Sequence, residues 1–222
     1  MNKIILFHGS PNQIVQPTFE AGNEKRDYGN GFYLTEDPEL AREWSAAIPT
    51  TQNGYVHQLE LDLTGLKILD FQKLSPLAWL AELMKHRNAG NSKRYRILAQ
   101  RFIDTYGVET SGYDGIKGWR ADASYFLIAK AFAKDEVDIT LLDELLKAGN
   151  FETEYCLKSE KAFQQLISIP EKLKTVDASW YQDKYNQRDR QARIHMKSLI
   201  DSEANAITNV FSTLAGSQLR EI

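Results

Sequence analysis

Residues 27–35 read Asp27-Tyr28-Gly29-Asn30-Gly31-Phe32-Tyr33-Leu34-Thr35, and the rest of the chain is organised around this stretch. Its glycines suit backbone angles that other residues avoid, and they let a ligand or another strand approach the main chain closely. The residues that follow alternate as in a strand, so the Tyr33 ring points away from the side of Phe32 and Leu34. The pattern predicts a turn and then a strand that presents one aromatic ring.

The segment after this strand predicts a helix. Glu36-Asp37-Pro38 is a typical helix start, with proline in the first turn and acids near the positive end of the helix dipole. On a helix over 38–47, Ala41, Trp44 and Ser45 share one face. Tyr33 and Trp44 then form two walls of a slot for a flat heteroaromatic ring, unless both rings simply fill the core.

Composition limits the class of protein. The 222 residues suit one domain, or one domain with an extension, and contents of 42% hydrophobic and 26% charged residues are ordinary for a globular protein. No apolar run reaches the roughly 18 residues that cross a bilayer. The apolar run at residues 4–7 predicts a first strand and no signal peptide. We therefore expect a cytoplasmic protein without membrane contact.

Charge and cysteine content exclude two further classes. A single cysteine, Cys156, excludes an internal disulfide framework and a cysteine-cluster metal site, and we expect no metal. The net charge of −3 speaks against nucleic-acid binding by the whole surface, although it leaves room for a local basic patch.

Strand and helix signals are intermixed without regular alternation, which favours an α+β fold. The expected strands cover residues 3–8, 32–34, 55–63, 66–71, 113–119, 154–159 and 172–181. The expected helices cover 38–47, 75–107 with a break at residues 90–91, 120–134, 139–147, 160–167 and the polar chain from 182 onward. Ser75-Pro76 and Ser159 mark two of the helix starts. We expect one domain over 1–181 and a polar helical C-terminal extension over 182–222.

Three spaced elements carry the functional prediction: His8-Gly9-Ser10 at the end of the first strand, Gly31-Phe32-Tyr33 at the start of a second, and Glu154 on a late strand. His8 alone is equally typical of a strand-end histidine bonded to a neighbouring carbonyl. Two longer motifs accompany them. One runs from Tyr113 to Gly118 and continues as Arg120-Ala121-Asp122-Ala123-Ser124-Tyr125-Phe126, and the other is Glu154-Tyr155-Cys156-Leu157-Lys158-Ser159-Glu160-Lys161-Ala162-Phe163.

In this order the motifs resemble the His–Tyr–Glu signature of the ADP-ribosyltransferase superfamily, in its diphtheria-toxin and poly(ADP-ribose) polymerase branch. The resemblance covers roughly residues 3–168 and is closest to a bacterial family of unassigned function, often encoded in toxin–antitoxin-like pairs. It implies a split β-sheet core with flanking helices. Two positions depart from that family: Asp122 is followed by Ala123 where a second acid is usual, and Glu154 stands where Gln is frequent.

The resemblance implies an NAD pocket and gives roles to individual residues. His8, Tyr33 and Glu154 would be the catalytic residues, with the Tyr33 ring on the nicotinamide and Glu154 on the ribose 2′-hydroxyl. NAD would also contact further residues, namely Gly9, Ser10, Gly31, Trp44, Arg120 and Asp122. Arg120 and Asp122 open a helix where a phosphate can bind, or they form a structural ion pair. Glu152-Thr153-Glu154 matches the Glu-x-Glu of arginine-modifying members, which would give Glu152 a role towards the acceptor.

The expected function is an NAD-dependent mono-ADP-ribosyltransferase, a bacterial toxin or effector that modifies an unidentified protein or nucleic acid and is held in check by an antitoxin or immunity protein. As an effector it would be delivered out of the cell that makes it. Alternatives are an NAD glycohydrolase and a non-catalytic nucleotide-binding or interaction module of the same fold.

The tail carries a basic cluster at Arg188, Arg190, Arg193 and Lys197. This cluster would engage an acidic protein surface or a phosphate backbone, or else belong to a helix packed back on the domain with Phe211 and Leu214 as anchors.

Overall fold

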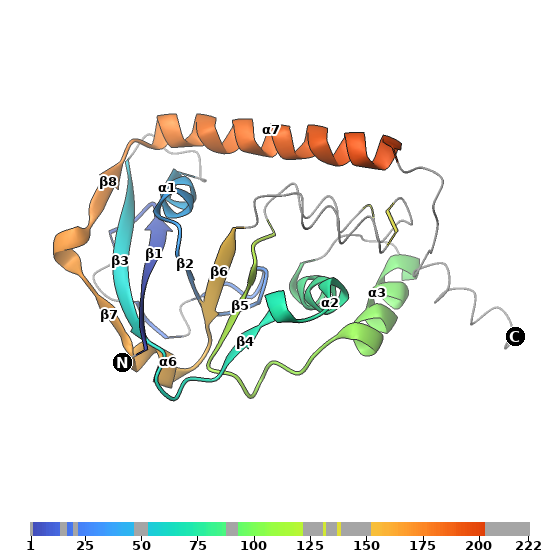
Figure 1. Cartoon of the computed structure of the whole chain (residues 1–222), viewed down its shortest axis with the longest axis horizontal. Coiled ribbons are helices and arrows are strands. Elements are labelled where there is room, and N and C mark those ends of the chain that lie inside the picture. The colour runs from blue at the N-terminus through green and yellow to red at the C-terminus, as the bar shows by residue number, and fades with distance from the viewer. Residues whose placement is uncertain are drawn as a thin grey trace, which may run out of the picture.

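The computed structural model describes residues 2–13, 17–19, 22–46, 53–87, 93–121, 131, 137–138 and 152–202. These residues form a mixed α and β architecture built on one sheet, which confirms the predicted class at that level. Figure 1 shows the sheet with helices beside it and the long helix α7, Ala178–Ser202, running across the top of the view. No helix within the described ranges combines the length and the apolar character needed to cross a membrane.

In the described chain, eight strands form the sheet in the order β4-β5-β6-β2-β1-β3-β7, and β8 also pairs with β3. The strands are β1 Lys3–Ser10, β2 Phe32–Thr35, β3 Gly54–Asp62, β4 Ile68–Asp70, β5 Gly115–Trp119, β6 Thr153–Leu157, β7 Leu166–Ser168 and β8 Lys174–Val176. Their pairings are antiparallel except the parallel pair β4–β5. The late strand β6 therefore lies in the middle of the sheet, between β2 and β5.

Sequence signals explain where the helices begin. The helices are α1 Pro38–Ala46, α2 Pro76–His86, α3 Lys93–Tyr106, α6 Glu160–Gln164 and α7, with short 3₁₀ turns η1 Phe71–Lys73 and η2 Pro170–Lys172. At α1, the Asp37 carboxylate accepts a hydrogen bond from the Glu39 amide at 2.8 Å. Ser75 and Ser159 cap α2 and α6 in the same way, as predicted.

Apolar side chains cover both faces of the sheet. On one face, Ile116 and Cys156 pack with Trp79 of α2 and Phe102 of α3. On the other face, Leu6, Leu34, Leu59, Leu157 and Ala162 of α6 form a second cluster. A third cluster joins α1 and α7 to the sheet through Ala41, Ala46, Val56, Val176 and Tyr181. The helices α1 and α2 thus flank the place where β2 and β6 meet.

Two predicted elements differ from the structure. The helix expected over 160–167 ends at Gln164, because residues 166–168 pair with β3 at the edge of the sheet and form β7. The strand expected over 172–181 is reduced to β8, and α7 already begins at Ala178, where Asp177 accepts a hydrogen bond from the Ser179 amide at 3.0 Å. The boundary predicted after residue 181, between the domain and the C-terminal extension, falls within α7. The helices expected over 120–134 and 139–147 lie almost wholly outside the described residues.

The strands β1 and β2 separate within the sheet. Phe7 lies opposite Thr35, and at the next position the His8 side chain, through Nδ1, reaches the Tyr33 carbonyl oxygen at 2.7 Å. A side chain here stands where a continuous ladder would have a backbone hydrogen bond. The register of β1 with β2 is therefore limited to the pair Phe7 and Thr35, while both strands belong to the same sheet.

Candidate functional site

The register of β2 with β6 brings two of the predicted catalytic residues to one face of the sheet. Tyr33 lies opposite Cys156, and Thr35 lies opposite Glu154. Because side chains alternate along a strand, all four of these side chains point to the same face. Gly118 of β5 flanks Glu154 on its other side and contributes no side chain. The pairing thus places the Glu154 carboxyl one pleat from the Tyr33 ring.

Glu154 is a buried ionisable group whose hydrogen bonding is incomplete. Only 4% of the residue is exposed, and its buried Oε1 has no hydrogen-bond partner among the described residues. Burial raises the pKa of Glu154 well above its ordinary value, and the negative Asp27 adds to this effect, whereas Arg120, Arg26 and Arg87 oppose it. A buried carboxyl without a partner costs free energy in folding, so it is a candidate for a group kept for chemistry.

Tyr33 is fixed by its hydroxyl group. The hydroxyl donates a hydrogen bond to the Gly29 carbonyl at 2.7 Å and accepts one from the Tyr28 amide at 3.0 Å. Gly29 has a φ of +75°, in the left-handed region that favours glycine, as predicted for this turn. Gly31 precedes β2 and faces the Cys156 thiol. The turn and the ring therefore hold each other in place.

His8 lies on β1, the neighbour of β2 in the sheet. Its ring stacks on Phe32 with ring centroids 4.5 Å apart, so it points to the side of β2 opposite the Tyr33 ring. Burial lowers the pKa of His8 to about 4, which keeps the ring neutral at pH 7. A carbonyl oxygen only accepts, so the bond to Tyr33 places the proton on Nδ1 and leaves Nε2 as an acceptor. The bond to a neighbouring carbonyl, which the sequence offered as an alternative role, is present.

The two residues after His8 are held by α1 and by a local turn. A Cβ atom on Gly9 would lie 1.8 Å from the Ala41 carbonyl oxygen, so the helix backbone rests directly on this glycine. Ser10 is 7% exposed, and its hydroxyl oxygen accepts a hydrogen bond from the Asn12 amide at 3.1 Å. Gly9 thus has a packing role, whatever it does towards a ligand.

Trp44 and Arg120 lie together next to Glu152. The Arg120 guanidinium carbon is 5.6 Å from the centroid of the Trp44 ring, and Arg120 Nη1 donates to Glu152 Oε2 at 2.8 Å. The Arg120 amide also donates to the Glu152 carbonyl at 3.1 Å. Arg120 is therefore held by Glu152. Asp122, its predicted neighbour in the site, lies outside the described residues.

Sequence reasoning missed Asp27 as a site residue, although it opens the stretch that organises the chain. Asp27 is 4% exposed, accepts hydrogen bonds from Arg87 Nε and from the Ala121 amide, both at 2.7 Å, and contributes to the raised pKa of Glu154. It ties the turn before β2 to the end of α2 and to the residue after Arg120. Its place before the glycine turn was the only signal in the sequence.

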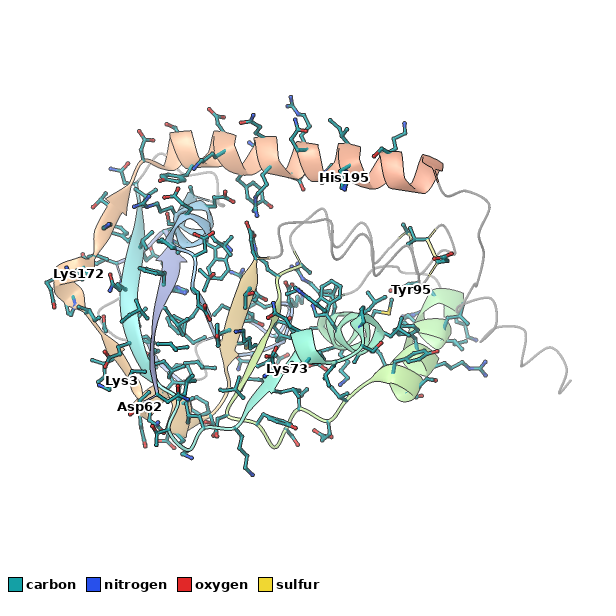
Figure 2. All side chains as sticks on the ribbon, viewed as in Figure 1. Lys3, Asp62, Lys73, Tyr95, Lys172 and His195 are labelled. Atoms are coloured by element: carbon teal, nitrogen blue, oxygen red, sulfur yellow. The ribbon has the colours of Figure 1, made fainter. Side chains whose placement is uncertain are left out.

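The second residue that the sequence did not assign to the site is Arg188 of α7. Its guanidinium forms ion pairs with Glu152 and, at 2.8 Å, with Glu43 Oε2 of α1. Past this point α7 extends beyond α1, and His195, labelled in Figure 2, lies on that part of the helix. The described side chains from Arg190 to Ser198 are exposed. The predicted basic cluster is thus divided, with Arg188 turned to the domain and Arg190, Arg193 and Lys197 to solvent.

Metal ligands are not gathered anywhere in the described segments, where no three His, Cys, Asp or Glu residues lie close enough to hold one ion. Comparison with known proteins gives one finding. A family model described as "Protein of unknown function (DUF3990)" matches residues 4–167, a span that includes β1, β2 and β6. Curated proteins and solved structures gave no match.

Proposed function

The chain belongs to the DUF3990 family of proteins of unknown function, and from its own site we propose that it is an NAD-dependent mono-ADP-ribosyltransferase with an ADP-ribosyltransferase-like split sheet. One observation supports this most directly. Glu154 is buried with an oxygen that has no partner, on the strand that pairs with the Tyr33 strand. The proposed transfer uses a carboxylate and an aromatic ring on one face, and Glu154 and Tyr33 would supply them.

The reaction breaks the bond between nicotinamide and C1′ of the ribose, and positive charge develops on the ribose. The Glu154 carboxylate would accept a hydrogen bond from the 2′-hydroxyl and stabilise that charge, which is commonly worth about 10²–10³ in rate for one such group. The nicotinamide leaves as a neutral ring with the bonding electrons. An acceptor atom then bonds to C1′ and gives up its proton.

Binding of NAD would itself help to ionise Glu154. In the free chain, burial favours the protonated carboxyl, and the Arg120 guanidinium favours the carboxylate. The nicotinamide ring of NAD carries a positive charge, so its arrival beside Glu154 adds a further interaction with the ionised form. The carboxylate would thus form at the moment when the substrate is in place.

The remaining predicted residues would position NAD. The Tyr33 ring is fixed through its hydroxyl, so a face of the ring can stack on nicotinamide without losing side-chain freedom, a contribution of about 0.5–1.5 kcal/mol. His8 Nε2 can accept a hydrogen bond from a hydroxyl of the adenosine ribose. Gly9 would offer its backbone to the carboxamide, and Trp44 would lie on the side of the nicotinamide opposite Tyr33.

The proposed biological role is that of a toxin or effector acting in a cytoplasm and restrained by an antitoxin or immunity protein. The resemblance to a bacterial family often encoded in toxin–antitoxin-like pairs supports this part of the proposal. The acceptor would be a macromolecule, and the chemistry described above leaves its attacking atom open.

The test is incubation with NAD labelled in the adenosine part, in the presence of bacterial protein and nucleic acid, with nicotinamide release measured in parallel. Wild-type protein is expected to label a macromolecule, and Glu154→Gln to lose most of the nicotinamide release. Glu171→Gln, on the exposed turn η2, is the matched control and should behave as wild type. Free ADP-ribose without labelling would indicate a glycohydrolase, and unchanged NAD would indicate a binding module.

The Glu154→Gln variant is expected to remain folded, and the raised pKa of Glu154 gives the reason. The folded-state pKa of Glu154 is raised, so the ionised carboxylate lowers the free energy of unfolding as pH rises above the ordinary carboxyl range. Glutamine removes that charge at similar size. At pH 8 the variant should therefore melt no lower than wild type, which separates lost chemistry from lost folding.

A further inference from the structure

Two carboxylates from different parts of the chain hold one guanidinium beside the proposed catalytic acid. Glu43 comes from α1 and is 8% exposed as a residue, and Glu152 comes from the segment just before β6, with 19% of its side chain exposed. Arg188 of α7 forms ion pairs with both. Glu152 stands two residues before Glu154, so its side chain lies on the same side of the strand, one pleat away.

The two arginines at Glu152 are held differently. Arg120 pairs with Glu152 Oε2, lies over the Trp44 ring and donates its backbone amide to the Glu152 carbonyl, so it continues the pairing of β5 with β6 at the ends of these strands. Arg188 occupies the other oxygen and lies on α7, a separate helix whose described contacts with the domain include Tyr181 and the Lys184–Glu39 ion pair at 3.1 Å. Arg188 is therefore the partner that can leave without disturbing the sheet.

One carboxylate oxygen of this pair lacks a hydrogen bond even with Arg188 present. Glu43 Oε2 is buried and lies 2.8 Å from Arg188 Nη2, but the two atoms lack the alignment of a hydrogen bond, so this oxygen has an ion-pair partner and no hydrogen-bond partner. A guanidinium that entered from outside would be free to turn its planar fork so that it donates hydrogen bonds to both carboxylates, whereas the described hydrogen bond of Arg188 in this pair goes to Glu152.

We propose that Glu43 and Glu152 form a guanidinium-binding subsite next to Glu154, and that Arg188 fills it in the free chain as a built-in competitor. The ligand class is an alkylguanidinium, as presented by an arginine side chain of a partner protein. This inference rests on the proposed function, in which the subsite would hold the side chain that accepts ADP-ribose. It makes α7 a strap whose Arg188 must leave before an external arginine enters.

The test is an NMR titration of the full chain with ethylguanidinium in the absence of NAD, with propylammonium as a cation of equal charge that lacks the planar fork. Arg188→Ala is expected to bind ethylguanidinium at least tenfold more tightly than wild type. Arg193→Ala is the matched control, because Arg193 lies on the same helix and its described ion pair is with Asp189 of that helix. It should bind as wild type does. Adding Glu43→Gln to Arg188→Ala should remove the gain.

The proposal is overturned if Arg188→Ala binds ethylguanidinium no more tightly than wild type, or if propylammonium binds equally well. Should Arg188→Ala fail to fold, Arg188→Lys serves instead, because lysine keeps a charge near Glu43 but cannot bridge both carboxylates. Arg188→Lys is expected to bind ethylguanidinium at least threefold more tightly than wild type. If its affinity is not increased, the subsite is overturned. NAD cleavage by wild type tests the proposed function separately, so the two failures are distinguishable.

Discussion

At the scale of single residues, His8 shows how the site fixes a protonation state. Nδ1–H donates to the Tyr33 carbonyl, and only the neutral ring leaves Nε2 open as an acceptor. Burial secures this by lowering the pKa of His8 from 6.5 to about 4. The unfolded chain therefore binds a proton below pH 6.5 that the folded chain refuses until about pH 4.

This difference predicts an acid-sensitive fold. The free energy of unfolding should fall as pH is lowered from 6.5 to 4, by up to about 3 kcal/mol from His8 alone. Chemical denaturation at several pH values measures it. In His8→Asn, whose amide can still donate to the Tyr33 carbonyl, the slope should flatten but not vanish, because burial lowers the pKa of His57 as well. An unchanged slope in His8→Asn would assign the sensitivity to other groups.

Tyr33 combines two roles that two substitutions separate. Tyr33→Phe keeps the ring but leaves the Gly29 carbonyl and the Tyr28 amide without their partner, so it should lower the free energy of unfolding by about 1–3 kcal/mol while NAD affinity changes little. Tyr33→Ala should also weaken NAD binding by about 1–3 kcal/mol, the usual effect of truncating a buried aromatic anchor. Calorimetric titration with NAD on the folded variants measures the NAD affinity of each. Equal NAD affinity in wild type and Tyr33→Ala would remove the stacking role.

At the scale of elements, the contact of α1 with β1 depends on a missing side chain. In Gly9→Ala the new methyl group would meet the Ala41 carbonyl at 1.8 Å and the Ser45 amide at 2.7 Å, both of them backbone. The helix must shift, so we expect a loss of about 1–3 kcal/mol in the free energy of unfolding. Gly112→Ala is the control, since its Cβ meets nothing within 4 Å. Thermal unfolding of the two variants should differ clearly, and equal melting temperatures would contradict this packing.

Local signals predicted the elements that depend on local chemistry. Pro76 and Ser75 start α2, the acids before Pro38 start α1, and the glycine turn delivers Tyr33 to a strand. The failures lie where a distant partner decides. Residues 166–168 carry the periodicity of a helix end but become β7 because the edge of β3 is available to pair with them.

In the candidate site too, the sequence predicted what depends on local motifs and missed what depends on distant partners. Tyr33 and Glu154 were predicted from their motifs, and their strands do pair. Glu43 and Arg188 meet only through the packing of α1 against α7, to which neither sequence neighbourhood points. Contacts that side chains make across separate helices have no spacing rule along the chain, so they stay invisible until the fold is known.

At the scale of the whole molecule, the proposed activity predicts an effect on living cells. Unregulated expression in a bacterial host should slow growth, because ADP-ribosylation would consume NAD and modify cellular components. His8→Ala should relieve the effect, since it removes the proposed contact to the adenosine ribose, and Glu171→Gln should not. Growth curves with matched soluble protein levels measure this. Normal growth with verified soluble wild-type protein would favour a harmless binding module or an absent target.

The position of β6 has a consequence for synthesis on the ribosome. The strand that carries Glu154 joins β2 to β5, yet its partner residues Thr35 and Gly118 leave the ribosome well before it. Until residue 157 has emerged, the strands made so far are neighbours only within two separate groups, β2-β1-β3 and β4-β5, which β6 joins in the complete sheet. A ribosome that stops before Thr153 would release a fragment that lacks Glu154 and in which β2, β5 and β3 all lack a partner strand, so it would be prone to aggregate. The central part of the sheet can therefore close only after β6, the strand with the proposed catalytic acid, has been made.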